Sequence, residues 1–323
     1  MRKPFLLLVL IPVLLLASCE GRTTLKETDY YKNDVVRTLT EDLKVNGTME
    51  AFAEDLCVLP REGFFDETLF VSDYVGLFSE TDKEVLYAKG ASQRLYPASV
   101  TKCMTALLVL KNVSDLEKEI IVGEELTEGI TGSSSMAGLV SGCAYTYKEL
   151  LYALLVPSGN DAANALAYHV GGSIENFVNM MNEEARSLGM LDTHFANPHG
   201  LHDKNHYTTV YDLYLLLNAL KDYPEFQECS GRTSISISGT TGQGEQIVHS
   251  YTSGNSYLRG YTVPPDGLHI VAAKTGYTAQ AGRCLVLTVI NDEGDRYYAI
   301  VCHSDTYDRL YAEMNALLSV IGQ

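Results

Sequence analysis

Residues 94–107 read RLYPASVTKCMTAL, a largely apolar stretch in which Ser99 and Lys102 stand out. From Ser99 to about Asn112 the sequence predicts a helix that is apolar on nearly every face, which places it in the middle of a domain. Ser and Lys three residues apart share one face of such a helix. Burial and the positive end of the helix dipole both favour a neutral lysine. Lys102 could then remove the proton of Ser99 and make its hydroxyl a nucleophile.

A second polar motif, Ser158-Gly159-Asn160, follows a predicted helix that Pro157 ends. A break between two helices can project short polar side chains into a cleft. There Ser158 could pass a proton from Lys102 to a leaving nitrogen, and Asn160 could hydrogen-bond Lys102 and a substrate amide. An ordinary turn between helices also favours Ser, Gly and Asn, so this motif alone decides nothing.

A third motif, Lys274-Thr275-Gly276, lies on a predicted strand. A strand edge beside a nucleophile can bind an extended peptide by strand addition, and Gly276 would let that peptide come close. Lys274 and Thr275 suit a terminal carboxylate. The alternative is a solvent-facing Lys-Thr pair on an edge strand.

The rest of the chain predicts strands at both ends and helices between them. The N-terminal strands are 69–78 and 84–89, residues 131–142 form a loop, and a strand at 268–273 continues through Lys274 to further strands at 284–290 and 296–302. Helices are expected at 147–156, 161–170, 173–188, 210–220 and the C-terminus. The fold class is therefore α+β, an antiparallel sheet built from both chain ends and packed against a helical cluster.

Taken together and in this order, the three motifs match the signature of β-lactamases and penicillin-binding proteins. Residues 94–107, 157–163, 197–201 and 274–278 resemble the low-molecular-weight D-Ala-D-Ala carboxypeptidases of serine peptidase family S11. The resemblance covers roughly residues 66 to 322. Gly159 in the second motif also separates the chain from the class A β-lactamases.

This resemblance implies a β-lactamase/transpeptidase-like fold and removal of the terminal D-Ala from peptidoglycan stem peptides. Ser99 would form the acyl-enzyme with Lys102 as base, while Ser158 and Asn160 handle protons and position the substrate. Lys274 and Thr275, with Gly276 beside them, would recognise the carboxylate, and the N–H groups of Ser99 and Tyr277 would form the oxyanion hole. It implies no metal or cofactor, and covalent inhibition of Ser99 by β-lactam antibiotics.

Other functions remain open at this point. A D,D-endopeptidase or transpeptidase would use the same residues, and a non-catalytic penicillin- or wall-binding lipoprotein is a further alternative. The spacing of His194, His199, His202 and His206 does not match a zinc site. An arginine that relatives use near the substrate carboxylate is not evident, and Arg259 and Arg283 are the candidates.

The N-terminus predicts export. Arg2 and Lys3 precede an apolar run, Phe5 to Leu16, of the size of a signal-peptide core. Leu16-Ala17-Ser18-Cys19 resembles a bacterial lipoprotein cleavage box, which implies lipidation of Cys19 and an extracytoplasmic protein on the bacterial cell membrane. The expected organisation is a signal peptide at 1–18, a tether and short segment at 19–65, and the D,D-peptidase domain at 66–323.

Charge and cysteine content narrow the partners and the redox chemistry. With 24 basic and 41 acidic residues the formal charge is −17, which argues against nucleic acid and against electrostatic adhesion to an anionic membrane. Six cysteines follow Cys19, and an even number could form disulfides. Their pairing cannot be inferred from the spacing of the cysteines. Cys103, Cys284 and Cys302 lie in apolar stretches, where a small buried thiol is expected.

Overall fold

The computed structural model describes residues 56–60, 65–132 and 134–322, all within a compact unit that begins at Phe52. The predicted signal peptide, the lipidation site Cys19 and most of the predicted tether lie outside the described residues. No helix of the described part is long and apolar enough to cross a membrane.

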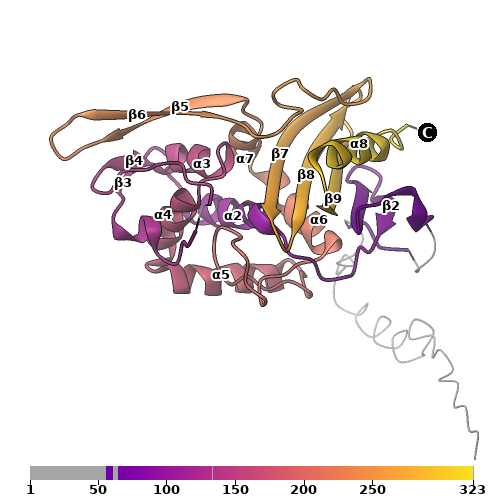
Figure 1. Cartoon of the computed structure of the whole chain (residues 1–323), viewed down its shortest axis with the longest axis horizontal. Helices are drawn as coiled ribbons and strands as arrows, with labels where there is room; N and C mark the ends of the chain where they lie inside the picture. Colours follow the sequence, from indigo (N-terminus) through magenta and orange to yellow (C-terminus); the bar gives the residue numbers. More distant parts are fainter. Residues whose placement is uncertain (1–55, 61–64, 133, 323) are drawn as a thin grey trace, which may run out of the picture. The chain divides into compact units, whose positions relative to one another are not determined.

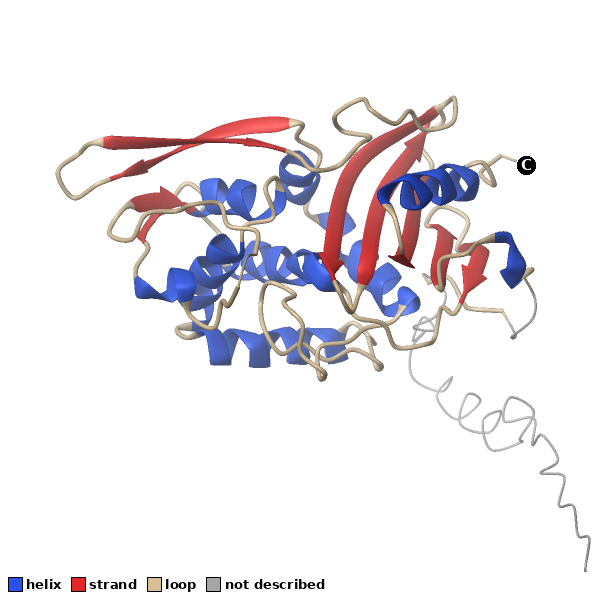
Figure 2. Ribbon diagram, viewed as in Figure 1, coloured by secondary structure: helices blue, strands red, loops and turns tan. Residues whose placement is uncertain are grey.

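A five-stranded antiparallel sheet forms one half of this unit, with strand order β2-β1-β9-β8-β7 (Figures 1 and 2). Its strands are β1 (Tyr74–Ser79), β2 (Glu84–Lys89), β7 (Leu268–Thr278), β8 (Gly282–Asn291) and β9 (Arg296–Ser304). The N-terminal hairpin pairs with the C-terminal strand β9, which confirms the predicted sheet built from both chain ends. Strand β7 is an edge of this sheet.

Each face of the sheet carries its own apolar core because side chains alternate along a strand. On one face Leu285, Leu287 and Val289 pack against the C-terminal helix α8 (Tyr307–Leu318). On the other face Val286 and Ile300 join the larger core that contains the central helix. That helix is therefore buried on all sides, as its sequence predicts.

All the predicted helices are present, and a short helix at 224–230 was not predicted. They are α2 (Lys102–Asn112), α3 (Tyr147–Leu155), α4 (Asn160–Gly171), α5 (Ile174–Ser187), α6 (Val210–Ala219) and α7 (Pro224–Ser230), with short 3-10 turns η1 (Glu67–Leu69), η2 (Ala98–Thr101), η3 (Glu124–Thr127) and η4 (Leu220–Asp222). Side-chain caps fix where they begin. Thr146 and Glu149 form a reciprocal capping box on α3, and Ser173 accepts a hydrogen bond from the Asn176 N–H at the start of α5.

The strands differ from the prediction in two places. The first predicted strand begins only at Tyr74, because Glu313 accepts hydrogen bonds from the Val71 and Ser72 N–H groups and holds that segment outside the sheet. A second, four-stranded sheet was not predicted. It consists of β3 (Glu119–Ile121), β4 (Ala144–Thr146), β5 (Ser234–Thr240) and β6 (Gln246–Thr252).

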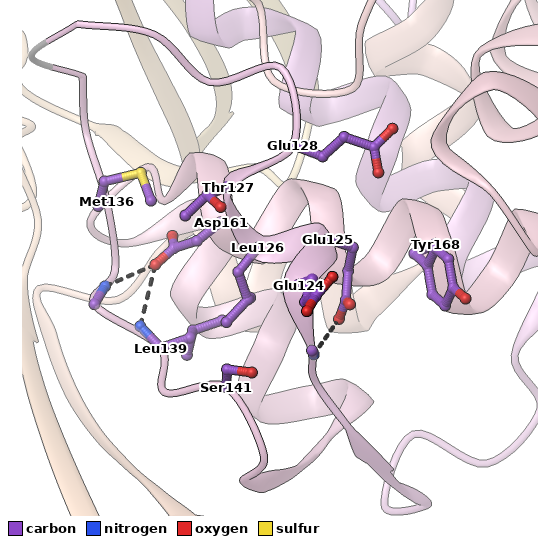
Figure 3. A pocket seen from close by; sticks show the side chains of 12 residues that line it. Glu124, Glu125, Leu126, Thr127, Glu128, Met136, Leu139, Ser141, Asp161 and Tyr168 are labelled. Carbon is purple, nitrogen blue, oxygen red and sulfur yellow. Dashed lines mark hydrogen bonds between the residues drawn. The ribbon is translucent and has the colours of Figure 1, made fainter.

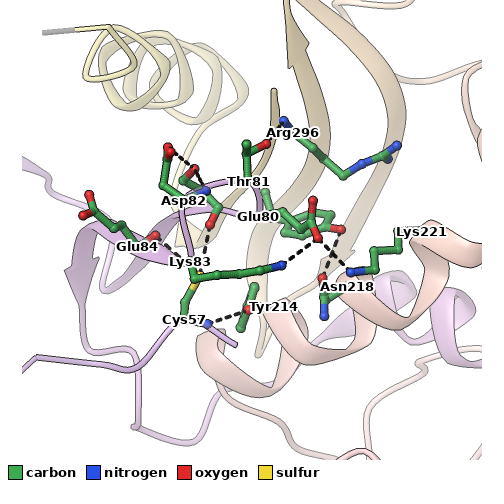
Figure 4. Close-up of polar contacts among 12 residues, drawn as sticks. Cys57, Glu80, Thr81, Asp82, Lys83, Glu84, Tyr214, Asn218, Lys221 and Arg296 are labelled. Carbon is green, nitrogen blue, oxygen red and sulfur yellow. Dashed lines mark hydrogen bonds and ion pairs between the residues drawn. The ribbon is translucent and has the colours of Figure 1, made fainter. Parts of the chain in front are cut away.

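Residues before the predicted domain boundary also belong to the packed unit. The Cys57 N–H donates to the Tyr214 hydroxyl at 2.8 Å (Figure 4). The Tyr211 hydroxyl donates to the Cys57 carbonyl at 2.8 Å, and both tyrosines are on α6. Nearby, Glu80 accepts from Lys83 and from Lys221, which joins the β1–β2 turn to η4. The core of the unit therefore includes Cys57, which is fully buried.

Candidate active site

Ser99 lies in the 3-10 turn η2, immediately before helix α2, so the predicted helix begins with a tighter turn than expected. Ala98 has a φ of 47°, an uncommon backbone conformation that makes a sharp turn immediately before Ser99. Lys102 begins α2, and its Nζ lies 3.1 Å from Ser99 Oγ. The structure thus brings the predicted nucleophile and base into hydrogen-bond contact.

Two carbonyl oxygens hold the Lys102 amine. Its Nζ donates to Asn160 Oδ1 at 2.7 Å and to the His199 carbonyl at 2.7 Å. A neutral amine has two N–H groups and one lone pair. The two acceptors use both N–H groups, which leaves the lone pair for the Ser99 hydroxyl proton.

The surroundings of Lys102 also favour its neutral form. The side chain is fully buried, and burial, followed by the positive charge of Lys274, holds the pKa of Lys102 well below its usual value. The three hydrogen-bond partners of its Nζ described above are all uncharged oxygens. A buried lysine in this state is suited to act as a general base near neutral pH.

Ser158 stands in the break between α3 and α4, with a φ of 65°. Its Oγ accepts a hydrogen bond from Lys274 Nζ at 2.9 Å, rather than contacting Lys102 directly. Gly159 packs tightly here, since an added Cβ would lie 2.7 Å from Ala137 Cβ and 2.8 Å from the Ala153 carbonyl. The Ser158-Gly159-Asn160 motif is therefore a fixed element of the cleft wall.

Asp161 holds the loop that forms the opposite wall. Its carboxylate accepts from the N–H groups of Ala137, Gly138 and Leu139, two of which are drawn in Figure 3. One residue earlier, the Asn160 N–H donates to the Ser135 carbonyl at 2.9 Å. These bonds position the 134–142 loop against α4. Asp161 was not predicted as a site residue, although an acidic residue in the first turn of a helix is a frequent capping signal.

Lys274 on β7 is the second buried cation of the site. Besides Ser158, its Nζ donates to the Thr275 carbonyl at 2.7 Å. Burial lowers the pKa of Lys274 to about 8. The two lysines therefore differ in character: Lys274 can carry a positive charge near neutral pH and attract an anion, while Lys102 resists protonation.

The edge strand β7 passes directly beside the nucleophile. A Cβ on Gly276 would lie 3.0 Å from the Ser99 nitrogen and 3.0 Å from the Pro97 carbonyl, so glycine permits this close approach. The cleft between β7 and the helical half encloses about 570 Å³. It is lined by predicted site residues from all three motifs: Ser99, Ser158, Asn160, Thr275, Gly276 and Tyr277.

The loop 197–201 supports the Lys102 side of the cleft. Asn197 Oδ1 accepts from the Gly200 N–H at 2.7 Å, and Thr105 of α2 donates to the Pro198 carbonyl at 2.6 Å. This places the His199 carbonyl on Lys102. This loop could be identified from the sequence only by its resemblance to the family, because no side-chain pattern reveals that its backbone oxygen is the functional group.

Two buried histidines are kept neutral beside the nucleophile. Burial lowers the pKa of both His199 and His206 to about 3. His206 Nδ1 accepts from the Ala196 N–H, so its Nε2 carries the proton and donates to Thr101 Oγ1, 2.7 Å away. Thr101 in turn donates to the Ala98 carbonyl at 2.8 Å. In the described residues no group of His, Cys, Asp or Glu side chains forms a metal-binding cluster.

The two candidate arginines lie in different places. Arg283 is stacked between Tyr277, 4.7 Å from its ring centroid, and Tyr307, 4.1 Å away, and both tyrosines line the cleft. Arg259 instead stacks on Tyr261, a residue that does not line the cleft. Of the two, only Arg283 stacks on residues that line the cleft.

A second cavity, of about 930 Å³, lies behind the 134–142 loop (Figure 3). Its lining includes Glu124 and Glu125 of η3, Glu128 directly after η3, and Tyr168 of α4. No residue of the three motifs lines it, and the carboxylate of Asp161, which does, is already occupied by backbone N–H groups. The larger cavity is therefore not where the chemistry is assembled.

Comparison with known proteins agrees with this arrangement. The profile of peptidase family S11, described as D-alanyl-D-alanine carboxypeptidase, matches residues 73–306. The D-alanyl-D-alanine carboxypeptidase DacF of Bacillus subtilis is 33% identical over 240 residues, which is 73% of this chain and 58% of DacF. A D-alanyl-D-alanine endopeptidase of Escherichia coli is 35% identical over 199 residues, 61% of this chain and 60% of that protein.

Solved structures share the fold. The crystal structure of the Streptomyces K15 DD-transpeptidase has a TM-score of 0.71 at 25% identity, covering 78% of this chain and 97% of that one. This confirms the predicted β-lactamase/transpeptidase-like class. The chain spans less than two thirds of the length of the curated relatives named above.

Proposed function

Because the chain belongs to the D-alanyl-D-alanine carboxypeptidase family, peptidase S11, we propose that it removes the terminal D-Ala from peptidoglycan stem pentapeptides through an acyl-enzyme on Ser99. The observation that carries the proposal is the arrangement of Lys102, whose two N–H groups are bound by Asn160 and His199 and whose lone pair is left for Ser99. A serine hydroxyl is a weak nucleophile without such a base.

Acylation begins when the peptide lies along β7 with its terminal carboxylate on Lys274 and Thr275. Ser99 Oγ attacks the carbonyl carbon of the penultimate D-Ala, and the hydroxyl proton moves to Lys102 Nζ. The carbonyl oxygen becomes an oxyanion held by the N–H groups of Ser99 and Tyr277. The position of Gly276 against the Ser99 nitrogen supports this, since it sets the two donors close together.

Collapse of the tetrahedral intermediate breaks the peptide bond. The leaving D-Ala nitrogen needs a proton, which Lys102 has just received, and Ser158 passes that proton from Lys102 to the nitrogen. Its hydroxyl is oriented by Lys274, which donates to its oxygen and leaves its own proton free to move. Water then attacks the ester, with Lys102 again as base, and releases the shortened peptide.

The direct experiment is mass spectrometry of a pentapeptide ending in D-Ala-D-Ala after incubation with the purified protein. Loss of one alanine, blocked by penicillin, supports the carboxypeptidase. Ser99→Ala should abolish both cleavage and covalent penicillin labelling, while Ser92→Ala, at an exposed position seven residues earlier, should retain both. Penicillin labelling that persists in Ser99→Ala would contradict the nucleophile assignment.

A D,D-endopeptidase is the second candidate, because a relative with 35% identity carries that name. It requires the same site but a cross-linked substrate. If the pentapeptide is untouched while Ser99 is still labelled by penicillin, cleavage of cross-linked muropeptide dimers becomes the expected activity. Absence of both reactions in folded protein would instead favour a non-catalytic wall-binding protein.

We also propose that residues 1–18 are a signal peptide and that Cys19 carries the lipid that attaches the protein to the outer face of the bacterial cell membrane. The support is the apolar run followed by Leu16-Ala17-Ser18-Cys19. Cys19→Ala should move the protein from the membrane pellet to the soluble extracytoplasmic fraction. A variant that stays in the pellet in the same amount would refute lipid attachment at Cys19.

A further inference from the structure

Two cysteines of neighbouring strands face each other beneath the catalytic strand. In the β8–β9 ladder Leu285 pairs with Val301 and Val286 pairs with Ile300, so the next position along the same face brings Cys284 opposite Cys302. Both cysteines belong to the same apolar core as Val286 and Ile300, and both are fully buried. Their side chains therefore point to the same side of the sheet from adjacent strands.

The ladder is irregular at this point. Arg283 pairs with Ser304 instead of His303, so β9 carries one extra residue between the two pairs. His303 takes up this residue with a φ of 63°. Such a bulge bends its strand locally, and it lies beside the two thiols.

The two thiols are close enough to affect each other's ionisation. The Cys284 thiol and burial raise the pKa of Cys302 well above its usual value, while the Cys302 thiol lowers the pKa of Cys284 against the opposing effect of burial. Directly opposed residues of antiparallel strands have Cβ atoms roughly 4.5–5.5 Å apart, and a disulfide needs about 3.5–4.5 Å. A small adjustment of the two strands is enough to join them. Cys57, by contrast, has its thiol directed at the carbonyls of Ser79 and Glu84.

We propose that Cys284 and Cys302 are a disulfide site, at which a thiol–disulfide oxidant joins β8 to β9. The Cys284 thiolate attacks one sulfur of the oxidant, forming a mixed disulfide and releasing one thiolate of the oxidant. The Cys302 thiolate then attacks Cys284 Sγ, forms the Cys284–Cys302 bond and releases the second thiolate. The protein loses two protons and two electrons, and the oxidant is reduced to two thiols.

The bond would lie close to the substrate-binding strand without touching the cleft. Cys284 pairs with Gly276 of β7, and its Sγ is 3.9 Å from the Tyr96 carbonyl, ahead of the nucleophile turn. On the other side Cys302 pairs with Tyr74 of β1. The link therefore fixes the register of β8 against β9, at the level of the catalytic residues. Because both sulfurs are buried, it forms while the chain folds and resists reductant afterwards.

Refolding with a defined oxidant tests the proposal. The full chain is unfolded, refolded in oxidised and reduced glutathione, unfolded again without reductant in the presence of N-ethylmaleimide, and digested. We expect a peptide pair cross-linked through Cys284 and Cys302, while Cys57, Cys103, Cys143 and Cys229 are alkylated. Alkylation of Cys284 and Cys302 themselves, or a cross-link that involves another cysteine, overturns the proposal. The readout does not depend on peptidase activity, so it stands apart from the proposed function.

Matched variants separate the disulfide from general effects of oxidation. The disulfide closes the loop between Cys284 and Cys302. This closure should make the Tm of the oxidised protein higher than that of the reduced protein by about 5 °C or more. Cys229→Ser, which removes a buried thiol of α7 away from the pair, should keep both this shift and the cross-link. Cys284→Ser should lose both. A Tm shift of equal size in Cys284→Ser and Cys229→Ser would refute the assignment.

Discussion

Replacement of Gly200 by alanine should damage the nucleophile turn more than any effect on backbone conformation can explain. Gly200 has a φ of +90°, and an added Cβ would lie 1.9 Å from the Ala98 carbonyl oxygen and 2.9 Å from Thr101 Oγ1. Ordinary contact begins near 3.4 Å, so the 197–201 loop and the η2 turn would have to separate by 3.4 − 1.9 = 1.5 Å. Ala98 is the neighbour of Ser99, and the same loop carries the carbonyl that holds Lys102.

Gly172 provides the matched control. It also has positive φ, +76°, at the end of α4, but an added Cβ would meet nothing within 4 Å. Alanine in a left-handed conformation costs about 1 kcal/mol, and overpacking adds about 1–3 kcal/mol more. Gly172→Ala should therefore lower Tm by about 2–4 °C, and Gly200→Ala by about 5–15 °C.

Activity should separate the two variants further. A displacement of about 1 Å in catalytic groups can reduce the rate by about 10²-fold. Gly200→Ala should thus lower the second-order rate of penicillin acylation by about that factor, and Gly172→Ala should leave it unchanged. The assays are thermal unfolding and stopped-flow acylation. If the two variants have the same Tm and the same acylation rate, the close approach of Gly200 to Ala98 is not a constraint on the site.

Three further predictions concern charge. The acylation rate should fall as the pH drops through the lowered pKa of Lys102, because the protonated amine cannot act as base. It should also fall above about pH 8, because Lys274 then loses the charge that attracts the carboxylate. A pH profile with no alkaline decline would contradict the role of Lys274. His206 is neutral when folded, with a pKa lowered to about 3, while an unfolded histidine binds a proton below about pH 6.5. The free energy of unfolding should therefore decrease as the pH falls from 6.5 towards 3. In denaturant titrations, His206→Gln should reduce the slope of this free energy against pH by about 1.4 kcal/mol per pH unit. An unchanged slope would exclude the histidine as its source. Asp161→Asn replaces one acceptor of the loop N–H groups by a donor, so Tm should fall by several degrees and the acylation rate by about tenfold. The control Asp308→Asn, in the exposed first turn of α8, should change neither Tm nor the acylation rate.

The elements that could be predicted from sequence are those whose pattern is local. The helix 147–156 has a capping residue at its start and Pro157 at its end, and the central helix carries apolar residues on every face. The sheet built from both chain ends followed from the positions of strand-like runs alone. Each of these depends on residues close together in the chain.

The second sheet shows where this reasoning fails. Strands β3 and β4 have three residues each, too few for a period to be recognised. Strand β5 does alternate, with Ile235 and Ile237 between serines, but the small polar residues resemble a loop. Its partner β6 is largely exposed, so no apolar face marks it.

In the site, residue types could be predicted but their partners could not. Ser99 and Lys102 are close because three residues separate them on a helical turn. Ser158 was expected beside Lys102 and instead bonds Lys274, a contact between residues more than a hundred positions apart. The carbonyl of His199 belongs to the backbone, which every residue has, so only the three-dimensional structure can single it out.

The surroundings of Lys102 have a consequence for the timing of the reaction. As a free amine, Nζ gives two hydrogens to Asn160 and His199 and receives one from Ser99; as an ammonium, it gives three hydrogens to the same three oxygens. Proton transfer therefore changes which atom owns a hydrogen but leaves every pair of heavy atoms in place. No neighbour has to turn or move when the charge appears, so the barrier contains little reorganisation of the surroundings. In both acylation and deacylation of the proposed reaction, Lys102 can therefore accept and return its proton without waiting for its neighbours to rearrange.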